Sequence, residues 1–223
     1  MLKLDLHVHS KYSEDGEGTP KEIIKSLKKR GLQGIAITDH NAVEGSLNAI
    51  KVAPKDFIVI PGVEISTKDG HMIALDINEN IPRGLSIQET VDKIIELGGT
   101  PIVPHLYRNM SGIKKEKLKI IINKISAIEV FNACSVPQSN LKMVKTAEEF
   151  NLGGTGGSDA HEPEYAGLGY TIVDSTDLRK DTIISEINKK KTWGKGTTLP
   201  LEYRSDRMVK SVKQFFQRGL KRI

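Results

Sequence analysis

Residues 2–22, LKLDLHVHSKYSEDGEGTPKE, contain the signals that decide the fold. Residues 2–8 are predicted to form a short strand that runs into a pair of histidines. Residues 19–22 predict the start of a helix, because threonine and glutamate three residues apart form a capping box and proline is favoured in the first turn. The stretch therefore predicts one strand–loop–helix unit.

The same unit recurs along the chain. Gly31 ends the first helix, residues 34–38 are the next predicted strand, and residues 43–52 are the next helix. This alternation predicts parallel strands, and short apolar strands indicate burial on both faces. Further strands are predicted near residues 57–60, 72–77, 100–103, 127–131, 152–155 and 168–173, and helices near 87–97, 114–124, 141–150 and 178–190, with irregular chain around Trp193.

The composition is that of a soluble globular protein. With 223 residues, 38% of them hydrophobic and 27% charged, the chain fits a single α/β barrel with a short appendage. No stretch has the roughly 20 apolar residues of a membrane span, and the N-terminus is charged too early for a secretory signal. The single cysteine, Cys134, excludes an internal disulfide and is interpreted as an inert buried thiol. These features favour a cytoplasmic protein.

The net charge of +5 comes largely from the residues after Ser205, so the body is close to neutral. This balance permits an anionic substrate and does not indicate a stable nucleic-acid complex. Residues 206–223 predict a basic amphipathic helix whose apolar face packs on the barrel or on a second copy of the chain, with a membrane surface or RNA as the alternative partner. The apolar positions are Met208, Val212, Phe215 and Phe216.

The six histidines are His7, His9, His40, His71, His105 and His161. Each lies at or near the end of a predicted strand or in a loop beside a carboxylate, and none lies inside a predicted helix. In a parallel α/β fold the loops after the strands converge on one face, so residues far apart in sequence become neighbours there. Histidines and carboxylates together are typical ligands of transition metals. The pattern therefore predicts a metal site at this face.

The candidate ligands are too many for one ion. Residues two apart in a strand point the same way, so His7 and His9 can bind one ion together. Asp15, with Glu14 as the weaker choice, follows on a turn that can fold back over that ion. Glu64 can bridge two cations, because a carboxylate has two oxygens. The set fits two or three divalent ions, with zinc, manganese or iron favoured over magnesium: His7, His9, Asp15, His40, Glu64, His71, His105, Asp159 and His161.

Five motifs resemble those of the polymerase and histidinol phosphatase (PHP) superfamily and occur in its order: DLHVHS (5–10), TDHN (38–41), PGVEIS (61–66), PH (104–105) and GSDAH (157–161). The resemblance implies a distorted seven-stranded, TIM-like (β/α)7 barrel that binds up to three metal ions and hydrolyses phosphate esters. It places the barrel in residues 1–165. Residues 166–223 resemble the PHP-associated region that completes the barrel, with the basic helix as a small appendage.

Position by position, the resemblance places His7, His9, Glu64 and Asp159 around a first ion, Glu64, His71 and His105 around a second, and Asp15, His40 and His161 around a third. An aspartate at position 15 resembles the stand-alone nucleotide-phosphatase and exonuclease branch, because histidinol phosphatases often have a histidine there. His71 keeps an alternative interpretation as a strand histidine in a local hydrogen bond.

Other residues have expected roles around the ions. Arg108 is expected to bind a substrate phosphate through its fork of donors, with an ordinary surface arginine as the alternative. His40 or His161 is a candidate proton donor to the leaving oxygen. Asp39 is expected to orient a neighbouring ligand, and Asn132 to line the pocket or cap a strand end.

The expected activity is hydrolysis of a phosphate monoester or diester, on a small nucleotide or a short nucleic-acid end, with histidinol phosphate as the next candidate. A carbon–nitrogen hydrolase of the amidohydrolase type is an alternative class, which Glu64 and the extra ligands disfavour. A PHP-like binding module is the non-enzymatic alternative, which the complete ligand set disfavours. Loss of the Glu64 charge is expected to be far more damaging than loss of the charge on Glu129.

Overall fold

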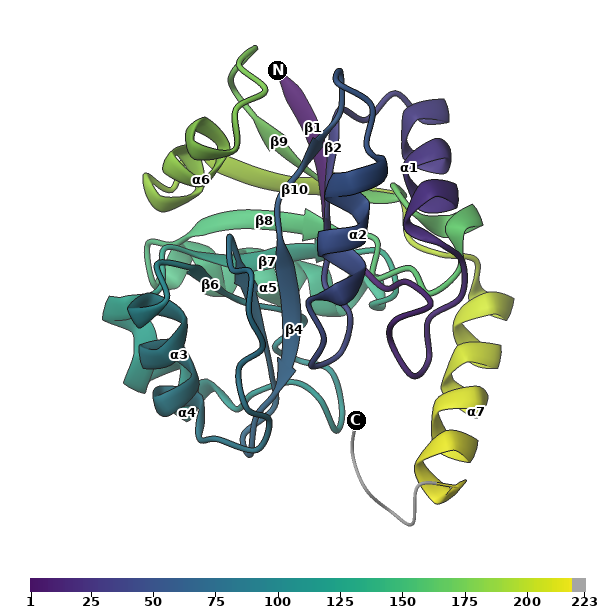
Figure 1. The fold of residues 1–223 in the computed structure, drawn as a ribbon. Coiled ribbons are helices and arrows are strands. Elements are labelled where there is room, and N and C mark those ends of the chain that lie inside the picture. The colour runs from purple at the N-terminus through teal and green to yellow at the C-terminus, as the bar shows by residue number, and fades with distance from the viewer. Residues whose placement is uncertain (218–223) are drawn as a thin grey trace.

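The structure is a computed structural model that describes residues 1–217, apart from four side chains in the last helix. Its described strands form two sheets with helices around them (Figure 1). In chain order the elements are β1 (Leu2–Val8), α1 (Pro20–Lys29), β2 (Gly34–Ile37), α2 (Glu44–Val52), β3 (Ile58–Val59), β4 (Gly62–Ser66), β5 (His71–Leu75), α3 (Ile87–Glu96), β6 (Thr100–Val103), α4 (Lys115–Ile121), the 3₁₀ turn η1 (Ile122–Lys124), β7 (Ala127–Asn132), α5 (Pro137–Glu149), β8 (Gly153–Gly157), the 3₁₀ turn η2 (Pro163–Tyr165), β9 (Gly169–Val173), α6 (Lys180–Asn188), β10 (Thr192–Gly196) and α7 (Leu201–Gln217).

The first strand–loop–helix unit forms as its sequence predicts. The Thr19 side chain accepts a hydrogen bond from the Glu22 backbone, and the Glu22 carboxylate accepts one from the Thr19 backbone at 2.7 Å. This capping box satisfies two amide groups that a helix start leaves without partners. Helix α1 then buries Ile23 and Leu27. The unit fixes the loop that follows His9.

The sheet topology is mixed rather than wholly parallel. The strand orders are β10-β9-β1-β2-β3 and β4-β5-β6-β7-β8. β1, β2 and β3 are parallel, as are β6, β7 and β8. β4 and β5 pair antiparallel, as do β5 and β6, β1 and β9, and β9 and β10. The prediction of parallel strands throughout is wrong at these places. For β4 and β5 the reason is that the short turn between them has no crossover helix and permits only antiparallel pairing.

The expected closed TIM-like barrel is not found among the described residues, although the α/β class is confirmed. Two isolated bridges, between Val8 and Ala160 and between His40 and Glu64, join the sheets at the site end. The backbones of β8 and β1 approach each other too closely for a side chain at Gly157. A Cβ atom on Gly157 would lie 2.3 Å from the Cβ atom of His7. Glycine therefore lets β8 pack against β1 directly below the site.

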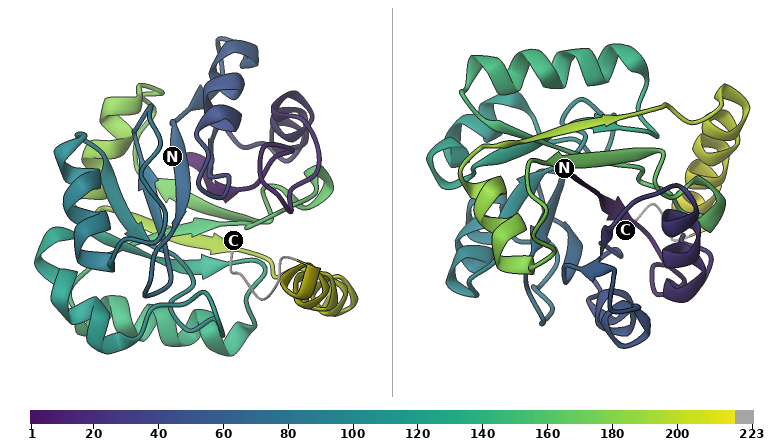
Figure 2. Two further views of the ribbon diagram at one scale, coloured as in Figure 1. Left: turned by 60° about the horizontal axis from the view of Figure 1, so that its bottom comes forward. Right: turned by 90° about the horizontal axis from the view of Figure 1, so that it is seen from above.

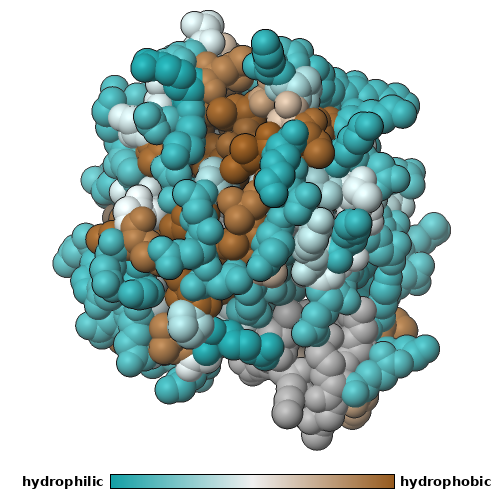
Figure 3. Space-filling view, in the orientation of Figure 1, coloured by the Kyte–Doolittle hydropathy of each residue, from teal (hydrophilic) through white to brown (hydrophobic). Residues whose placement is uncertain are grey.

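The two sheets share a hydrophobic core at the N-terminal ends of the parallel strands. This core contains Leu4 of β1, Ile73 of β5 and Ile102 of β6, and Ile183 and Ile187 of α6 pack against them. Helices lie around the outside of the strands (Figure 2). On the face in Figure 3, hydrophobic residues gather in the middle, around β4, between hydrophilic borders. The opposite, C-terminal ends of the strands are left for polar residues.

The C-terminal part differs from expectation in two ways. Trp193 lies in strand β10, which pairs with β9, rather than in irregular chain. Helix α7 begins at Leu201 rather than at residue 206, and residues 218–223 of the expected helix lie outside the described residues. None of the described helices combines the length and hydrophobicity of a membrane-spanning segment.

Helix α7 turns its basic side toward the body of the protein. Of the apolar residues expected to pack on the barrel or on a second copy of the chain, Val212 and Phe216 are 46% and 66% exposed. The side that faces the body instead carries Arg207 and Lys210, which reach carboxylates of the loop after β1. Packing of Val212 and Phe216 on the barrel is therefore not found, whereas packing on a second copy of the chain stays a prediction. The expected packing of Met208 and Phe215 concerns side chains outside the described set.

Candidate metal centre

Four ligand atoms from three separate parts of the chain converge at the C-terminal end of β1. His9 Nε2 lies 3.3 Å from His7 Nε2, from Glu64 Oε2 and from Asp159 Oδ1. His7 Nε2 lies 3.4 Å from the Glu64 oxygen and 3.5 Å from the Asp159 oxygen. A tetrahedral ion with bonds of about 2.0–2.1 Å separates its ligand atoms by about 3.3–3.4 Å. The four atoms therefore have the spacing of one coordination sphere.

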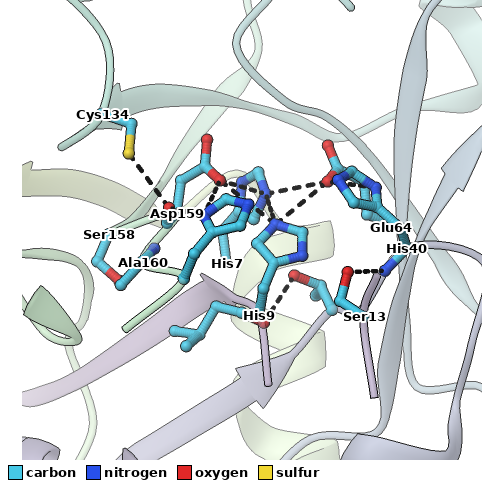
Figure 4. Close-up of polar contacts among 12 residues, drawn as sticks. His7, His9, Ser13, His40, Glu64, Cys134, Ser158, Asp159 and Ala160 are labelled. Carbon is cyan, nitrogen blue, oxygen red and sulfur yellow. Dashed lines mark hydrogen bonds and ion pairs between the residues drawn. The ribbon is translucent and has the colours of Figure 1, made fainter. Parts of the chain in front are cut away.

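The tautomers of these histidines favour a cation between them. His7 Nδ1 donates to Glu129 Oε1 at 2.9 Å, so a neutral His7 ring presents only a lone pair on Nε2. That lone pair faces oxygens of Glu64 and Asp159 and the ring of His9 (Figure 4). Acceptors this close repel one another unless a positive charge lies between them. The donor set fits a transition-metal ion.

The second oxygen of Glu64 gathers another pair of histidines. His71 Nδ1 and His105 Nε2 each lie 3.0 Å from Glu64 Oε1, and His40 Nδ1 lies 3.2 Å from Glu64 Oε2. Glu64 is thus the one residue shared by the first two predicted groups, as a bridging carboxylate would be. His71 therefore contacts the predicted bridging carboxylate directly.

The third predicted group forms around Asp15. Its Oδ2 lies 3.0 Å from His161 Nε2 and 3.8 Å from His40 Nε2. His161 Nδ1 donates to the Asp159 carbonyl at 2.9 Å, so the neutral ring again points a lone pair at a carboxylate. The His9 and His161 rings stack at 4.2 Å. The structure thus brings all nine predicted ligands into one continuous cluster.

The ionisation of the cluster suits cation binding. Burial works against charge on Glu64 and Asp159, but the neighbouring histidines, and Arg108 beside Asp159, hold the pKa of both carboxyls well below the usual range. Burial lowers the pKa of His40 to about 3 and that of His105 to about 4, so both rings are neutral. Ionised carboxylates and neutral imidazoles are the forms that bind metals.

His7 is the exception among the rings. Burial disfavours its charge, yet Asp159, Glu129 and Glu64 raise its pKa well above the usual value. In the metal-free protein a proton on His7 therefore supplies positive charge where a cation would otherwise supply it. Binding of an ion is expected to displace this proton.

A second layer of polar residues holds the ligands from behind. Glu129 accepts from the His7 ring through one oxygen, and from the His105 backbone at 3.0 Å and the Asn132 amide at 2.9 Å through the other. Asn132 also donates to Asp159 Oδ2 at 3.0 Å. The prediction that loss of the Glu129 charge is milder than loss of the Glu64 charge stays a prediction, but sequence reasoning assigned Glu129 no role at the site. Its position at the end of β7, beside the other strand-end ligands, was the available signal.

Arg108 is anchored at the rim of the cluster. Its Nη2 lies 2.6 Å from Asp159 Oδ2 and donates to Asn132 Oδ1 at 3.0 Å. The side chain remains 30% exposed, so donors remain available to a ligand. An ordinary surface arginine would lack such buried partners. Asn132, expected to line the pocket or cap a strand, joins Arg108 to Glu129.

Several neighbours hold the backbone rather than the rings. Asp39 accepts from the Ser10 backbone at 2.5 Å and from the Ser10 hydroxyl at 2.7 Å, so it positions the chain next to His9. Asp159 has a φ of 52°, a left-handed conformation that is unfavourable for aspartate. Cys134 Sγ contacts the Asp159 carbonyl at 3.2 Å, and burial raises the pKa of its thiol, as expected for an inert cysteine.

Arg207 of helix α7 is a site residue that the sequence did not reveal. Its Nη2 lies 3.3 Å from Asp15 Oδ2, and its Nη1 lies 3.4 Å from the Asp15 carbonyl. No motif surrounds Arg207, and 192 residues separate it from Asp15. Only the placement of the last helix beside the first loop brings the two together.

An α/β fold with histidines and carboxylates gathered for several ions at the strand ends defines a metal-dependent hydrolase class. Comparison with known proteins specifies it further. The PHP domain matches residues 5–97 and the PHP-associated family matches residues 137–192. The chain belongs to the PHP family of metal-dependent phosphoesterases.

The chain is similar to several known proteins. An uncharacterized protein of Methanocaldococcus jannaschii is 38% identical over 59% of this chain and 82% of its own length, and a second is 30% identical over 82% and 76%. The 3′,5′-nucleoside bisphosphate phosphatase of Chromobacterium violaceum is 36% identical over 37% of this chain and 30% of that enzyme. A two-domain protein from Bacteroides vulgatus, containing a predicted PHP-like metal-dependent phosphoesterase, matches with a TM-score of 0.75 at 19% identity, over 88% of this chain and 65% of that one.

Proposed function

We propose that this protein hydrolyses phosphate esters with the help of two or three divalent metal ions, manganese, zinc or iron. The observation that carries the proposal is the convergence of four ligand atoms at 3.3–3.5 Å, with Glu64 shared by a second group. Bound divalent ions supply Lewis acidity, a nucleophilic water and charge neutralisation at phosphorus.

The protein's own residues position the substrate and protect the cluster. Arg108 has an exposed edge beside Asp159 and can donate two parallel hydrogen bonds to a phosphate. Glu129 and Asn132 keep Asp159 and His7 from turning away when ligands bind. His40 and His161 lie on the Asp15 side, where either can give a proton to a leaving oxygen.

The proposed substrate is a small nucleotide or a short nucleic-acid end, and histidinol phosphate is the next candidate. Two observations support a nucleotide. Asp15 occupies the position that resembles the nucleotide-phosphatase branch, and the similar Chromobacterium violaceum enzyme is named for nucleoside bisphosphates. In this proposal residues 1–165 form the catalytic domain and residues 166–223 the associated region. No stable nucleic-acid complex is proposed, while a homo-oligomer and a cytoplasmic location stay predictions.

A panel of phosphate esters tests the proposal. Protein purified without chelator is analysed for metal content, loaded with manganese, and assayed on nucleoside monophosphates and bisphosphates, short oligonucleotides, histidinol phosphate and acyl amides. We expect more than one ion per chain and turnover of at least one phosphate ester. Turnover of amides alone would support the amidohydrolase alternative, and full metal content without turnover of any ester would support a binding module.

A further inference from the structure

Helix α7 turns a row of cations toward the Asp15 side of the metal centre. The row occupies every third position, so its members lie along one helix face with a rise of about 4.5 Å between them. Each member contacts a loop near the strand ends. Arg204 donates to the Ser135 carbonyl, Arg207 to Asp15 and Lys210 to Glu17.

Arg207 is the member that reaches the cluster. It contacts the Asp15 oxygen that also faces His161 Nε2 at 3.0 Å. Its side chain is 13% exposed, so it is held at the site without being sealed from solvent. A guanidinium has five N–H donors, and its described contacts with Asp15 use two of them. The remaining donors can bind an anion beside the cluster.

The two arginines flank the same cluster from different sides. Arg108 contacts Asp159, whose other oxygen faces His7 and His9, whereas Arg207 contacts Asp15. Hydrogen bonds connect Arg108 to Arg204, which lies one turn before Arg207 in α7. Asn132 Oδ1 accepts from Arg108 and from the Ser135 backbone, and Ser135 O accepts from Arg204.

One further donor in this region is unused. Arg204 Nε is buried and has no hydrogen-bond acceptor among the described residues. A buried N–H without an acceptor is costly unless a ligand or water supplies one. An N–H donor without an acceptor therefore lies between α7 and the loop after β7, one helical turn from Arg207.

We propose that Arg207 is a positioning residue that binds a second anionic group of the substrate while Arg108 binds the phosphate to be hydrolysed. This inference rests on the proposed phosphoesterase function and specifies its substrate class. One phosphate held by the cations and Arg108 does not require a second arginine beside Asp15. A nucleotide that carries a second phosphate group, free or esterified, places one anion at each flank.

The experiment compares substrates that differ only in the second anionic group. Wild-type protein, Arg207→Ala, Arg207→Lys and the control Lys213→Ala are loaded with manganese. Phosphate release is measured from adenosine 3′,5′-bisphosphate and from the 3′- and 5′-monophosphates. If only diesters are turned over, a dinucleotide with and without a terminal phosphate replaces them. Lys213 is exposed on the same helix, so its loss removes an equal charge away from the site.

We expect Arg207→Ala to raise KM for the bisphosphate about tenfold, as loss of a hydrogen bond to a charged group does, with kcat within about twofold. The monophosphates should change less than about twofold, Arg207→Lys should recover part of the loss, and Lys213→Ala should behave as wild type.

A different pattern overturns the inference. If Arg207→Ala lowers kcat equally for every substrate and also reduces manganese content, Arg207 only holds the Asp15 loop. If Lys213→Ala has the same effect as Arg207→Ala, general charge explains the result. Failure of the proposed function itself is distinguishable, because the wild-type protein would then release phosphate from no ester.

Discussion

The Asp159 and Asp15 flanks of the metal centre are built differently. Asp159 follows strand β8, its backbone N–H donates to the His7 carbonyl at 2.7 Å, and its Oδ2 is held by Asn132 and Arg108. Asp15 lies in the loop between β1 and α1. Its carboxylate accepts from the Ser13 hydroxyl at 2.9 Å and pairs with Arg207 of α7. One flank is anchored in the sheets and the other in a loop and a terminal helix.

This difference teaches which part of the centre is preorganised. Ligands supported by buried second-layer groups keep their geometry without an ion, whereas ligands in loops gain theirs partly from the ion. We therefore expect a tightly held ion on the Asp159 flank and a more readily exchanged one on the Asp15 flank.

Removing the charge that connects the flanks should have the largest effect. Glu64→Gln keeps the shape of the side chain but loses the bridge between two histidine groups. We expect a folded protein that loses bound metal and at least about a hundredfold in phosphoesterase rate, the scale of losing a principal electrostatic stabiliser. Metal analysis and steady-state kinetics measure this. The control is Glu148→Gln, an exposed residue of α5. Near-normal hydrolysis with full metal content would refute the bridging role.

The anchored flank can be tested through Glu129. Because Glu129 orients the His7 ring and holds the His105 backbone, we expect Glu129→Gln to lower metal affinity or rate about ten- to a hundredfold. Equilibrium dialysis with manganese, alongside kinetics, measures both quantities. A variant indistinguishable from wild type would show that the second layer does not preorganise the Asp159 flank.

Asp15→Asn tests the loop flank. We expect selective loss of one ion and about a tenfold fall in rate, with little change in melting temperature, because the loop is held at other points. Glu14→Gln is the neighbouring control. Equal losses of rate and melting temperature would identify Asp15 as a structural turn residue, and a greater effect of Glu14→Gln would make Glu14 the ligand.

The smallest effect concerns the support of the loop flank by Asp39. Burial raises the pKa of Asp39 to about 6, so the folded protein holds a proton there that the unfolded chain releases near pH 4. The contribution of this proton to the free energy of unfolding is present at low pH and is lost as the pH rises through 6. In chelator, the stability advantage of wild type over Asp39→Asn should shrink by about 1 kcal/mol between pH 5 and 8. Urea unfolding measures it, and a growing advantage would contradict the assignment.

The same contrast separates what the sequence predicts from what it does not. The capping box at Thr19 and the strand at Thr100–Val103 are confirmed because local residues determine them. Most of the nine ligands are brought together because the C-terminal ends of parallel strands converge. His71 instead begins β5 and reaches the site because β5 runs antiparallel to β4. Each motif carries its ligand on a short segment, so the resemblance needed no long-range information.

The features that were missed depend on tertiary placement. Glu129 gains its role only when β7 lies beside β1 and β6, and Arg207 only when α7 crosses to the first loop. The β4–β5 hairpin was missed because no separate strand was predicted at residues 62–66, which hold Glu64. The inward-facing basic side of α7 was missed because the carboxylates opposite Arg207 and Lys210 belong to the loop after β1, far away in the sequence.

The pairing of β1 with β9 has a consequence for biosynthesis. Leu2 and Val173 lie opposite each other in the sheet, and His9 is paired in the cluster with Asp159. On the ribosome the first strand can pair early with β2, but residues far downstream must emerge before β9 can pair with its other edge, and such distant contacts form slowly. The first coordination sphere therefore assembles late in translation. A nascent chain that displays only DLHVHS has a histidine pair but no complete cage with which to retain a metal ion.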